Sequence, residues 1–214
     1  METLIIGGVF VAIAVAIAYK IREYLREIKA EQDEIDSTLE RLSAEYKESY
    51  SFSDVDQKLI NDAALCLRRE CPHGLAQRLS QYRTHQERKE SVKKLVYQMA
   101  ISTGVELEDV LIEDDMPDGM LGQYQSGYIC INAVVMEADP ERILMTIAHE
   151  LRHGVQFQAC LDGKDQWGFS TETKAIWYYN IQYYISYPYE KYVKQPIEYD
   201  ADTFANAVIQ SYKS

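Results

Sequence analysis

The first apolar pattern along the chain is an unbroken run at its start, LIIGGVFVAIAVAIAY, over residues 4–19. The run approaches the roughly 18–20 apolar residues that cross a bilayer as one helix. Basic residues follow it, whereas a signal peptide carries its positive residues first. The pattern predicts a single-pass membrane anchor over residues 1–19, and the positive-inside bias places the rest of the chain in the cytoplasm. A cleaved signal peptide and a buried helix of a soluble domain are the alternatives.

Residues 20–50 form a charged stretch that contains no glycine and no proline. Apolar residues recur in it at alternating spacings of four and three, interrupted by Gln32, which is the pattern of a heptad seam. We expect one amphipathic stalk helix. It either pairs with a second copy as a coiled-coil homodimer or packs on the globular part of its own chain, and both interpretations stay open. The seam consists of Ile21, Leu25, Ile28, Ile35, Leu39, Leu42 and Tyr46.

The remaining residues, 51–214, carry the patterns of an α+β domain with a small mixed sheet. The cap-type residues Ser51, Ser53 and Asp54 open a helix, Gly104 ends a second one, and Asp139 caps a third. β-branched and aromatic stretches predict strands on both sides of a turn at 116–122. The predicted helices span residues 51–71, 87–104, 137–161, 170–186 and 196–212, and the predicted strands span 105–115 and 127–135.

Composition narrows the function classes. The 34 acidic against 22 basic residues give a formal net charge of -12, so no basic surplus exists to neutralise phosphates, and nucleic acid is not an expected partner. None of the four cysteines forms a CxxC pair, and apolar flanks predict buried free thiols, in agreement with a cytoplasmic body. Two disulfides in an oxidising compartment are the alternative.

The candidate chemistry lies in TIAHELRHGVQ, residues 146–156. On a helix His149 and His153 lie one turn apart on one face, so two imidazoles can point at one metal ion. Glu150 flanks that ion and can take a proton from its bound water. This is the arrangement of the HExxH motif, which combines two zinc ligands with a general base. A surface helix with two unrelated histidines is the alternative.

A catalytic zinc ion normally has a third protein ligand, and the other histidines of this chain lie upstream of the motif. A downstream carboxylate is therefore the simplest choice. Glu198 opens the last predicted helix, and Asp202 follows four residues later on the same face. We expect Glu198 to complete the metal site and Asp202 to accept the remaining ring N–H of His149. Asp162 and Glu172 are rival ligands, and an acidic pair favoured by the helix dipole is the alternative.

The motif HELRH with a downstream E-x-x-x-D helix resembles the gluzincin branch of zinc metallopeptidases. The short scaffold resembles the minigluzincins, compact zincin-like domains, over roughly residues 107–212. The resemblance implies Zn²⁺ bound by His149, His153 and Glu198, with Glu150 as the base and Asp202 behind His149. It also implies an edge strand near the motif helix that pairs with an extended peptide or protein substrate, with residues 127–135 in or beside that sheet.

A hydrolytic site also needs a donor near the developing oxyanion. Tyr192 and Tyr189, followed by Tyr187, are the candidates just before the last helix, although with 17 tyrosines in the chain packing is the alternative role. The sequence thus predicts a membrane-anchored zinc-dependent peptidase. A zincin-like, metal-binding interaction module that is latent or not proteolytic is the alternative.

Overall fold

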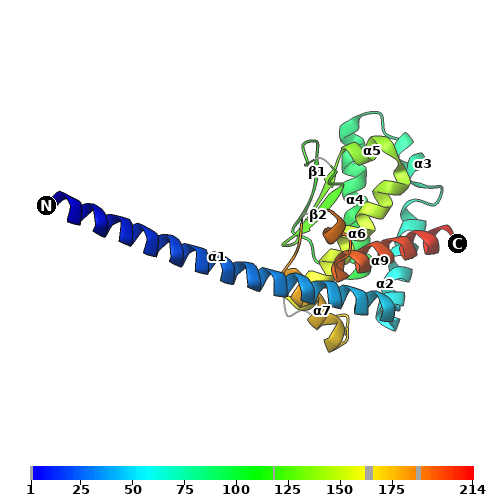
Figure 1. Ribbon diagram of the computed structural model, residues 1–214. Coiled ribbons are helices and arrows are strands. Elements are labelled where there is room, and N and C mark those ends of the chain that lie inside the picture. Colours follow the sequence, from blue (N-terminus) through cyan, green and yellow to red (C-terminus); the bar gives the residue numbers. More distant parts are fainter. Residues whose placement is uncertain (1, 118, 162–165, 187–188) are drawn as a thin grey trace.

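One long helix, α1 (Glu2–Ser49), projects from a body formed by the rest of the chain, and its N-terminal end lies far from that body (Figure 1). The computed structural model describes residues 2–117, 119–161, 166–186 and 189–214, without the side chains of residues 2–19, 137 and 138. The body is mostly helical and contains a small mixed sheet, which confirms the predicted α+β class.

The helices of the body agree with the predicted ones, apart from the short α3, α5 and α8, which the sequence patterns do not predict. The body helices are α2 (Asp54–Glu70), α3 (Leu75–Ser80), α4 (His85–Thr103), α5 (Val134–Ala138), α6 (Pro140–Cys160), α7 (Thr171–Gln182), α8 (Tyr189–Tyr192) and α9 (Pro196–Lys213). The strands are β1 (Asp109–Glu113), β2 (Gly122–Gln125) and β3 (Tyr128–Asn132).

Local side-chain chemistry fixes several of these helix ends. Ser53 and Asp56 form a reciprocal capping box that starts α2. Asp139 accepts a hydrogen bond from the backbone N–H of Glu141 and caps α6. Gly104 ends α4 in the left-handed region at φ 78°, which glycine adopts without steric strain. The predicted boundaries at Ser53, Asp139 and Gly104 are thereby confirmed.

The sheet has the strand order β1-β3-β2, with β3 parallel to β1 and antiparallel to β2. Two expectations need correction here. Strand β2, which begins at the last residue of the predicted turn, Gly122, is not among the predicted strands. Its sequence is not β-branched, and it forms because its main chain pairs with β3. Strand β3 stops at Asn132 rather than at Val135, because the Asn132 side chain accepts from the N–H of Val134 and donates to the Met120 carbonyl.

Helix α6 is the centre of the body and contacts both the sheet and α9. Its apolar residues Ile143, Ile147 and Leu151 are at most 1% exposed. Gly154 allows the close approach, because a Cβ there would lie 2.7 Å from Val105 and 3.2 Å from the Tyr124 ring. The same helix carries the HELRH motif, so the core that holds α6 also holds the candidate chemistry.

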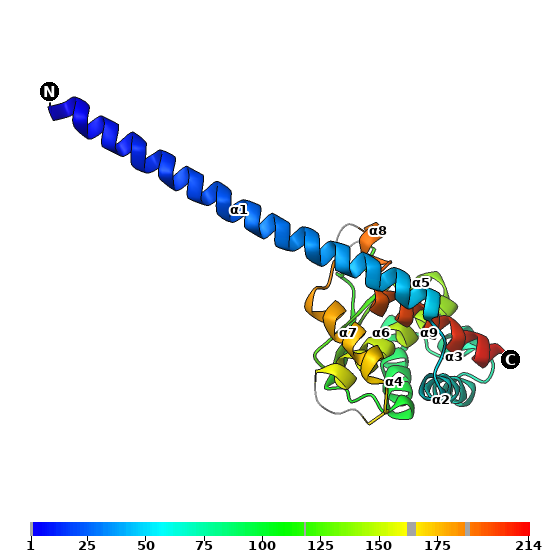
Figure 2. The same ribbon diagram turned by 60° about the horizontal axis from the view of Figure 1, so that its bottom comes forward.

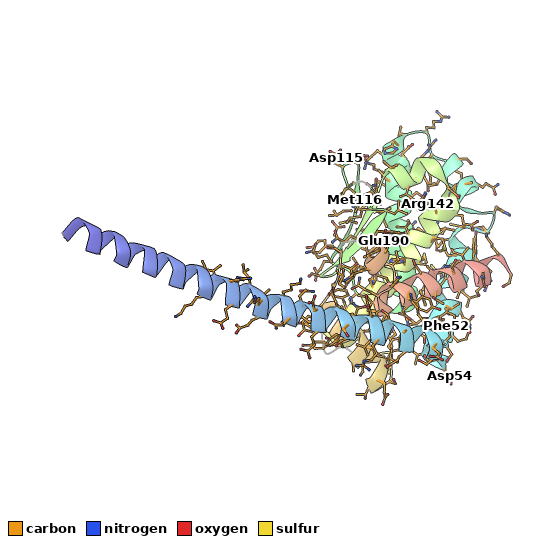
Figure 3. All side chains as sticks on the ribbon, in the orientation of Figure 1. Phe52, Asp54, Asp115, Met116, Arg142 and Glu190 are labelled. Atoms are coloured by element: carbon orange, nitrogen blue, oxygen red, sulfur yellow. The ribbon has the colours of Figure 1, made fainter. Side chains whose placement is uncertain are left out.

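The two halves of the heptad seam in α1 have different environments. From Ile35 onward the helix packs on its own body, with Leu39 and Tyr46 buried. Figure 2 shows the C-terminal end of α1 lying across α9, with α8 beside it. Asp36 of α1 forms an ion pair with Lys191 of α8. The preceding part of α1 projects from the body, and the side chains of residues 20–34 on it are exposed (Figure 3). Ile21 and Leu25 are 54% and 58% exposed, which leaves that half of the seam accessible to a second copy.

Among the described residues no helix has the length and apolarity that crossing a bilayer requires. The side chains of the predicted anchor, residues 1–19, lie outside the described residues.

A buried ion pair joins the helices of the body. Arg152 of α6 donates from Nε to Asp200 Oδ2 at 2.7 Å and from Nη2 to Asp200 Oδ1 at 2.9 Å and Asp56 Oδ1 at 2.6 Å. Arg152 and Asp200 are 1% and 0% exposed. The guanidinium also lies 5.0 Å from the ring centroid of Trp177. One cation thus ties α6 to α2, α7 and α9.

Replacing Arg152 by methionine is expected to lower the free energy of unfolding by about 3–5 kcal/mol, because it leaves two carboxylates buried without their cation. Denaturant unfolding of the full chain followed by circular dichroism measures this loss. Arg142→Met, on the exposed surface of the same helix, is the control and should change stability by less than about 0.5 kcal/mol. Equal stability of the two variants would contradict the assigned role of Arg152.

Candidate metal centre

The HELRH helix α6 and the helix α9 bring three potential metal ligands together. The Nε2 atoms of His149 and His153 are 3.0 Å apart. Glu198 Oε2 lies 3.4 Å from His149 Nε2, and Glu198 Oε1 lies 3.4 Å from His153 Nε2. Ligands about 2.0–2.1 Å from a tetrahedral ion are separated by about 3.4 Å, so these spacings suit a metal ion of that kind. The three residues form a group that could hold a metal ion.

His149 is oriented by Asp202, as the sequence predicts. The His149 Nδ1 atom lies 2.9 Å from Asp202 Oδ1. Because an ionised carboxylate only accepts hydrogen bonds, Nδ1 carries the proton and Nε2 faces the other ligands. Asp202 follows Glu198 by one helical turn, so a single face of α9 supplies both the third ligand and the group that orients the first one.

His153 is oriented by Gln156, a residue to which the sequence analysis assigns no role. Gln156 Nε2 donates to Asp200 Oδ2 at 2.6 Å and to the Ile197 carbonyl at 3.0 Å. Because both of these groups are acceptors, the amide must present its oxygen to His153 Nδ1, at 2.8 Å. Nδ1 of His153 therefore carries a proton, and its Nε2 is directed at the shared centre.

The Glu198 carboxylate gives the clearest indication that these residues suit a cation. It is 1% exposed, and its Oε1 accepts a hydrogen bond from Tyr184 Oη at 2.7 Å. Its Oε2 is buried and has no hydrogen-bond partner among the described residues. An unpartnered buried carboxylate oxygen is costly, and a metal ion beside the two imidazoles would satisfy it. The residues present thus fit a divalent cation.

The protonation equilibria point in the same direction. Burial lowers the pKa of His149, but the nearby carboxylates of Asp202 and Glu198 outweigh burial and raise it to about 10. Burial also opposes charge on His153, and the carboxylate of Glu198 outweighs it, so this pKa is raised. Burial would raise the pKa of Glu198, but the two histidines hold it well below its usual range. The carboxylates thus stabilise positive charge at the two imidazoles, which a proton or a metal ion can supply.

Glu150 lies beside this centre, between α6 and the start of β2. It is 5% exposed, and burial raises its pKa, while the nearby His149 and His153 act in the opposite direction. A Cβ on Gly122 would lie 2.8 Å from Glu150 Oε1, so only glycine leaves room for this carboxylate. Glu150 is thus held against the edge strand next to the candidate metal ligands.

Two tyrosines interact with Glu198, and a third packs on them from outside. Tyr184 reaches it directly, and Tyr192, whose pKa burial and the charge of Glu198 raise, lies against Tyr184 with ring centroids 6.0 Å apart. Tyr189 stacks on Tyr192 at 6.0 Å and is 69% exposed, so it stands one ring further out. Tyr187 lies outside the described residues.

Of the rival ligands, Glu172 is exposed in the first turn of α7 and Asp162 lies outside the described residues.

Tyr184 and Gln156 are absent from the sequence prediction for different reasons. Nothing separates Tyr184 from the other tyrosines along the chain. Gln156, in contrast, could have been found through Asp200. Asp200 falls on the apolar face of α9 near Phe204, and a carboxylate at such a position requires a buried hydrogen-bond partner.

Comparison of the chain with protein-family models, with curated proteins and with solved structures found no match.

The full chain is expected to bind one zinc ion, measured by competition with a chromophoric chelator. Glu198→Ala should weaken binding by more than about 100-fold, because loss of an outer hydrogen-bond partner alone costs roughly 10–100-fold. Glu172→Ala, which removes the exposed rival carboxylate, should bind as the wild type does. Equal zinc affinity of the Glu198 variant and the wild type would exclude Glu198 as a ligand.

Proposed function

We propose that this protein is a membrane-anchored, zinc-dependent peptidase whose body lies in the cytoplasm. The observation that carries the proposal is the convergence of His149, His153 and the unpartnered oxygen of Glu198 beside a buried glutamate, Glu150. The anchor rests on the apolar run at residues 4–19. A structural metal site would not need Glu150 held next to the ligands, so hydrolysis is the better explanation of the arrangement.

His149, His153 and Glu198 would hold the zinc ion, which when bound supplies Lewis-acid polarisation of a carbonyl group and acidifies water. Glu150 accepts the proton of the attacking water and then passes it to the leaving amine. Its raised pKa suits both steps, because a weaker acid is a stronger base when ionised. The tight fit against Gly122 keeps the carboxylate in one position.

The substrate would be an extended peptide or protein segment bound along β2. This strand is an edge, since β3 is its neighbour on one side in the described sheet. Residues 127–135 lie in the sheet as expected and provide its central strand β3, so the edge strand beside Glu150 is β2. An added strand gains main-chain hydrogen bonds at such an edge. Gly122 begins β2 beside Glu150, so a peptide paired with β2 passes the catalytic base.

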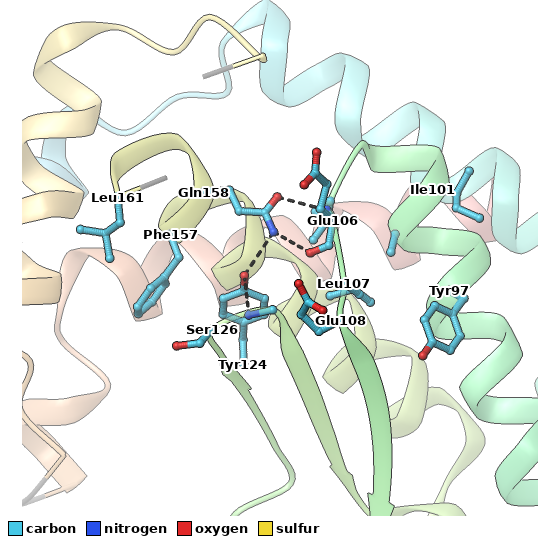
Figure 4. A pocket seen from close by; sticks show the side chains of 13 residues that line it. Tyr97, Ile101, Glu106, Leu107, Glu108, Tyr124, Ser126, Phe157, Gln158 and Leu161 are labelled. Atoms are coloured by element: carbon cyan, nitrogen blue, oxygen red, sulfur yellow. Dashed lines mark hydrogen bonds between the residues drawn. The ribbon is translucent and has the colours of Figure 1, made fainter. Parts of the chain in front are cut away.

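The hydroxyl groups near Glu198 are candidate donors to the developing oxyanion. Tyr192 keeps this proposed role, with Tyr189 behind it, and Tyr184 joins them because its hydroxyl already lies in the centre. A hydroxyl that bonds Glu198 at rest must turn toward the substrate to act. A cavity of about 600 Å³ is lined by residues such as Tyr97, Tyr124 and Leu161 and by none of these groups (Figure 4).

A zinc-binding interaction module without proteolysis is the second candidate. Two observations favour it: the His149 side chain is only 17% exposed, and Tyr184 caps Glu198. Both restrict access to the centre. Incubation with a peptide library, with and without a zinc chelator, distinguishes the candidates, because only the peptidase gives chelator-sensitive cleavage.

Glu150→Gln is expected to lower the cleavage rate by about 100- to 10,000-fold, the usual contribution of general acid–base catalysis, while zinc affinity stays the same. Rates on a cleaved library peptide and chelator competition give the two values. Glu141→Gln, an exposed position in the first turn of the same helix, is the matched control. A Glu150→Gln variant as active as the wild type would show that another group is the base.

Gly122→Ala is expected to reduce cleavage by more than about 10-fold, because its methyl group would displace Glu150, and a misplaced catalytic group loses rate steeply. Zinc affinity should stay the same, since the atoms nearest to a Cβ at Gly122 belong to Thr146 and Glu150 and not to a proposed ligand. Gln123→Ala, at the exposed neighbouring position, is the control for general damage to β2. Unchanged cleavage by Gly122→Ala would contradict the tight fit described for Glu150.

A further inference from the structure

We propose that Gln156 is a positioning residue for His153 and that it connects the metal centre to the end of α1, where Tyr46 lies in the last turn and Tyr50 directly follows the helix. Tyr46 and Tyr50 bond to Asp200, Asp200 holds Gln156, and Gln156 holds His153. The stalk helix is therefore part of the support of the centre and not only its tether. This inference rests on the metal centre of the proposed function, but it does not require that peptides are cleaved.

The first step of the connection is the buried carboxylate of Asp200. Its Oδ1 accepts from Tyr50 at 2.9 Å and from Tyr46 at 3.3 Å, and its Oδ2 accepts from Gln156 at 2.6 Å. Arg152 supplies the opposing charge through both oxygens. Because Asp200 is 0% exposed, water does not replace a donor that is lost, and each donor helps to fix the carboxylate.

The second step is the amide of Gln156, which is also 0% exposed. Its NH₂ group has two acceptors, Asp200 Oδ2 and the Ile197 carbonyl, and this leaves its oxygen for His153. If Asp200 moved, the amide could rotate and present its NH₂ group to the imidazole. His153 would then favour the tautomer whose protonated Nε2 cannot bind a metal ion.

The third step is the packing that keeps the two tyrosines in place. Tyr46 and Tyr50 meet edge to face with ring centroids 5.3 Å apart, and Tyr50 meets Tyr199 of α9 at 5.5 Å. Trp177 of α7 donates to the Tyr46 hydroxyl at 3.4 Å. Displacing the end of α1 from the body removes both hydroxyls from Asp200 together. The position of α1 is thereby expected to control how firmly His153 is held.

The first experiment compares Gln156→Leu with Gln158→Leu in the full chain. Both residues are buried glutamines on α6, but Gln158 bonds to the Glu106 backbone and the Tyr124 hydroxyl and not to a proposed metal ligand. Gln156→Leu should bind zinc about 10- to 100-fold more weakly, and Gln158→Leu should bind it as the wild type does. Equal affinities of the two variants would overturn the role of Gln156.

A spectroscopic measurement separates positioning from general destabilisation. In the zinc-loaded protein with ¹⁵N-labelled histidine, the Nδ1 proton of His153 should exchange slowly with water because it bonds to Gln156 inside the body. The slow signal should disappear in Gln156→Leu and remain in Gln158→Leu. A slow His153 Nδ1 proton in Gln156→Leu would contradict the proposal even if zinc binding is weakened.

The second experiment tests α1 with the double variant Tyr46→Phe and Tyr50→Phe, which keeps the rings and removes both donors to Asp200. Zinc should bind about 3- to 10-fold more weakly, less than for Gln156→Leu because Arg152 still holds Asp200. The control is Tyr199→Phe, since that ring packs on Tyr50 but is not a donor to Asp200 in the described contacts. Identical zinc affinities of the double variant and this control would remove α1 from the support of the centre.

These outcomes are independent of peptide cleavage. A protein that binds zinc and responds to Gln156→Leu as described, yet cleaves no peptide, would refute the proposed peptidase and support this inference. A protein that cleaves peptides with unchanged zinc affinity in Gln156→Leu would support the peptidase and refute the inference.

Discussion

The body of this protein depends on a cation and two carboxylates buried together, Arg152 with Asp200 and Asp56. Charges removed from water are tolerated only when each one is paired and hydrogen-bonded, so the helices that carry them have little freedom to shift. The pair also lies directly behind the candidate metal centre, since Arg152 precedes His153 in the chain and Asp200 follows Glu198 by two residues. The interaction that holds α6 against α9 is for this reason also the one that sets the spacing of the ligands.

The last helix, α9, presents residues of the metal centre on one face and packs into the core with the other. Glu198 and Asp202, one turn apart, face the histidines, while Asp200 faces the opposite way into the core. A rigid element that presents ligands on one side and is fixed on the other is a suitable support for a metal site, because ligand geometry then depends on packing and not on flexible side chains. Gln156 links the two faces by bonding to both His153 and Asp200.

The sequence patterns predict most of the helices, because caps and apolar spacing act within a few residues of each other. Ser53, Gly104 and Asp139 are examples. The same approach misses β2, whose formation depends on main-chain pairing with β3, and it overextends β3 beyond Asn132. The stalk is a third case. Its heptad pattern suits a partner helix or its own body equally well, and only packing from Ile35 onward assigns the second half to the body.

By itself the sequence determined two local sets of residues: His149 and His153 one turn apart with Glu150 between them, and Glu198 and Asp202 one turn apart on a later helix. Helical geometry alone places such residues on common faces, so their relation needs no knowledge of the fold. The tertiary structure decided which carboxylate joins the histidines, which tyrosine reaches it, and that Gln156, Asp200 and the end of α1 stand behind His153. Those contacts join residues far apart in the chain, such as Tyr46 and Asp200. Local spacing does not predict them, because a charged group buried in the core forms its hydrogen bonds and ion pairs with side chains from other helices.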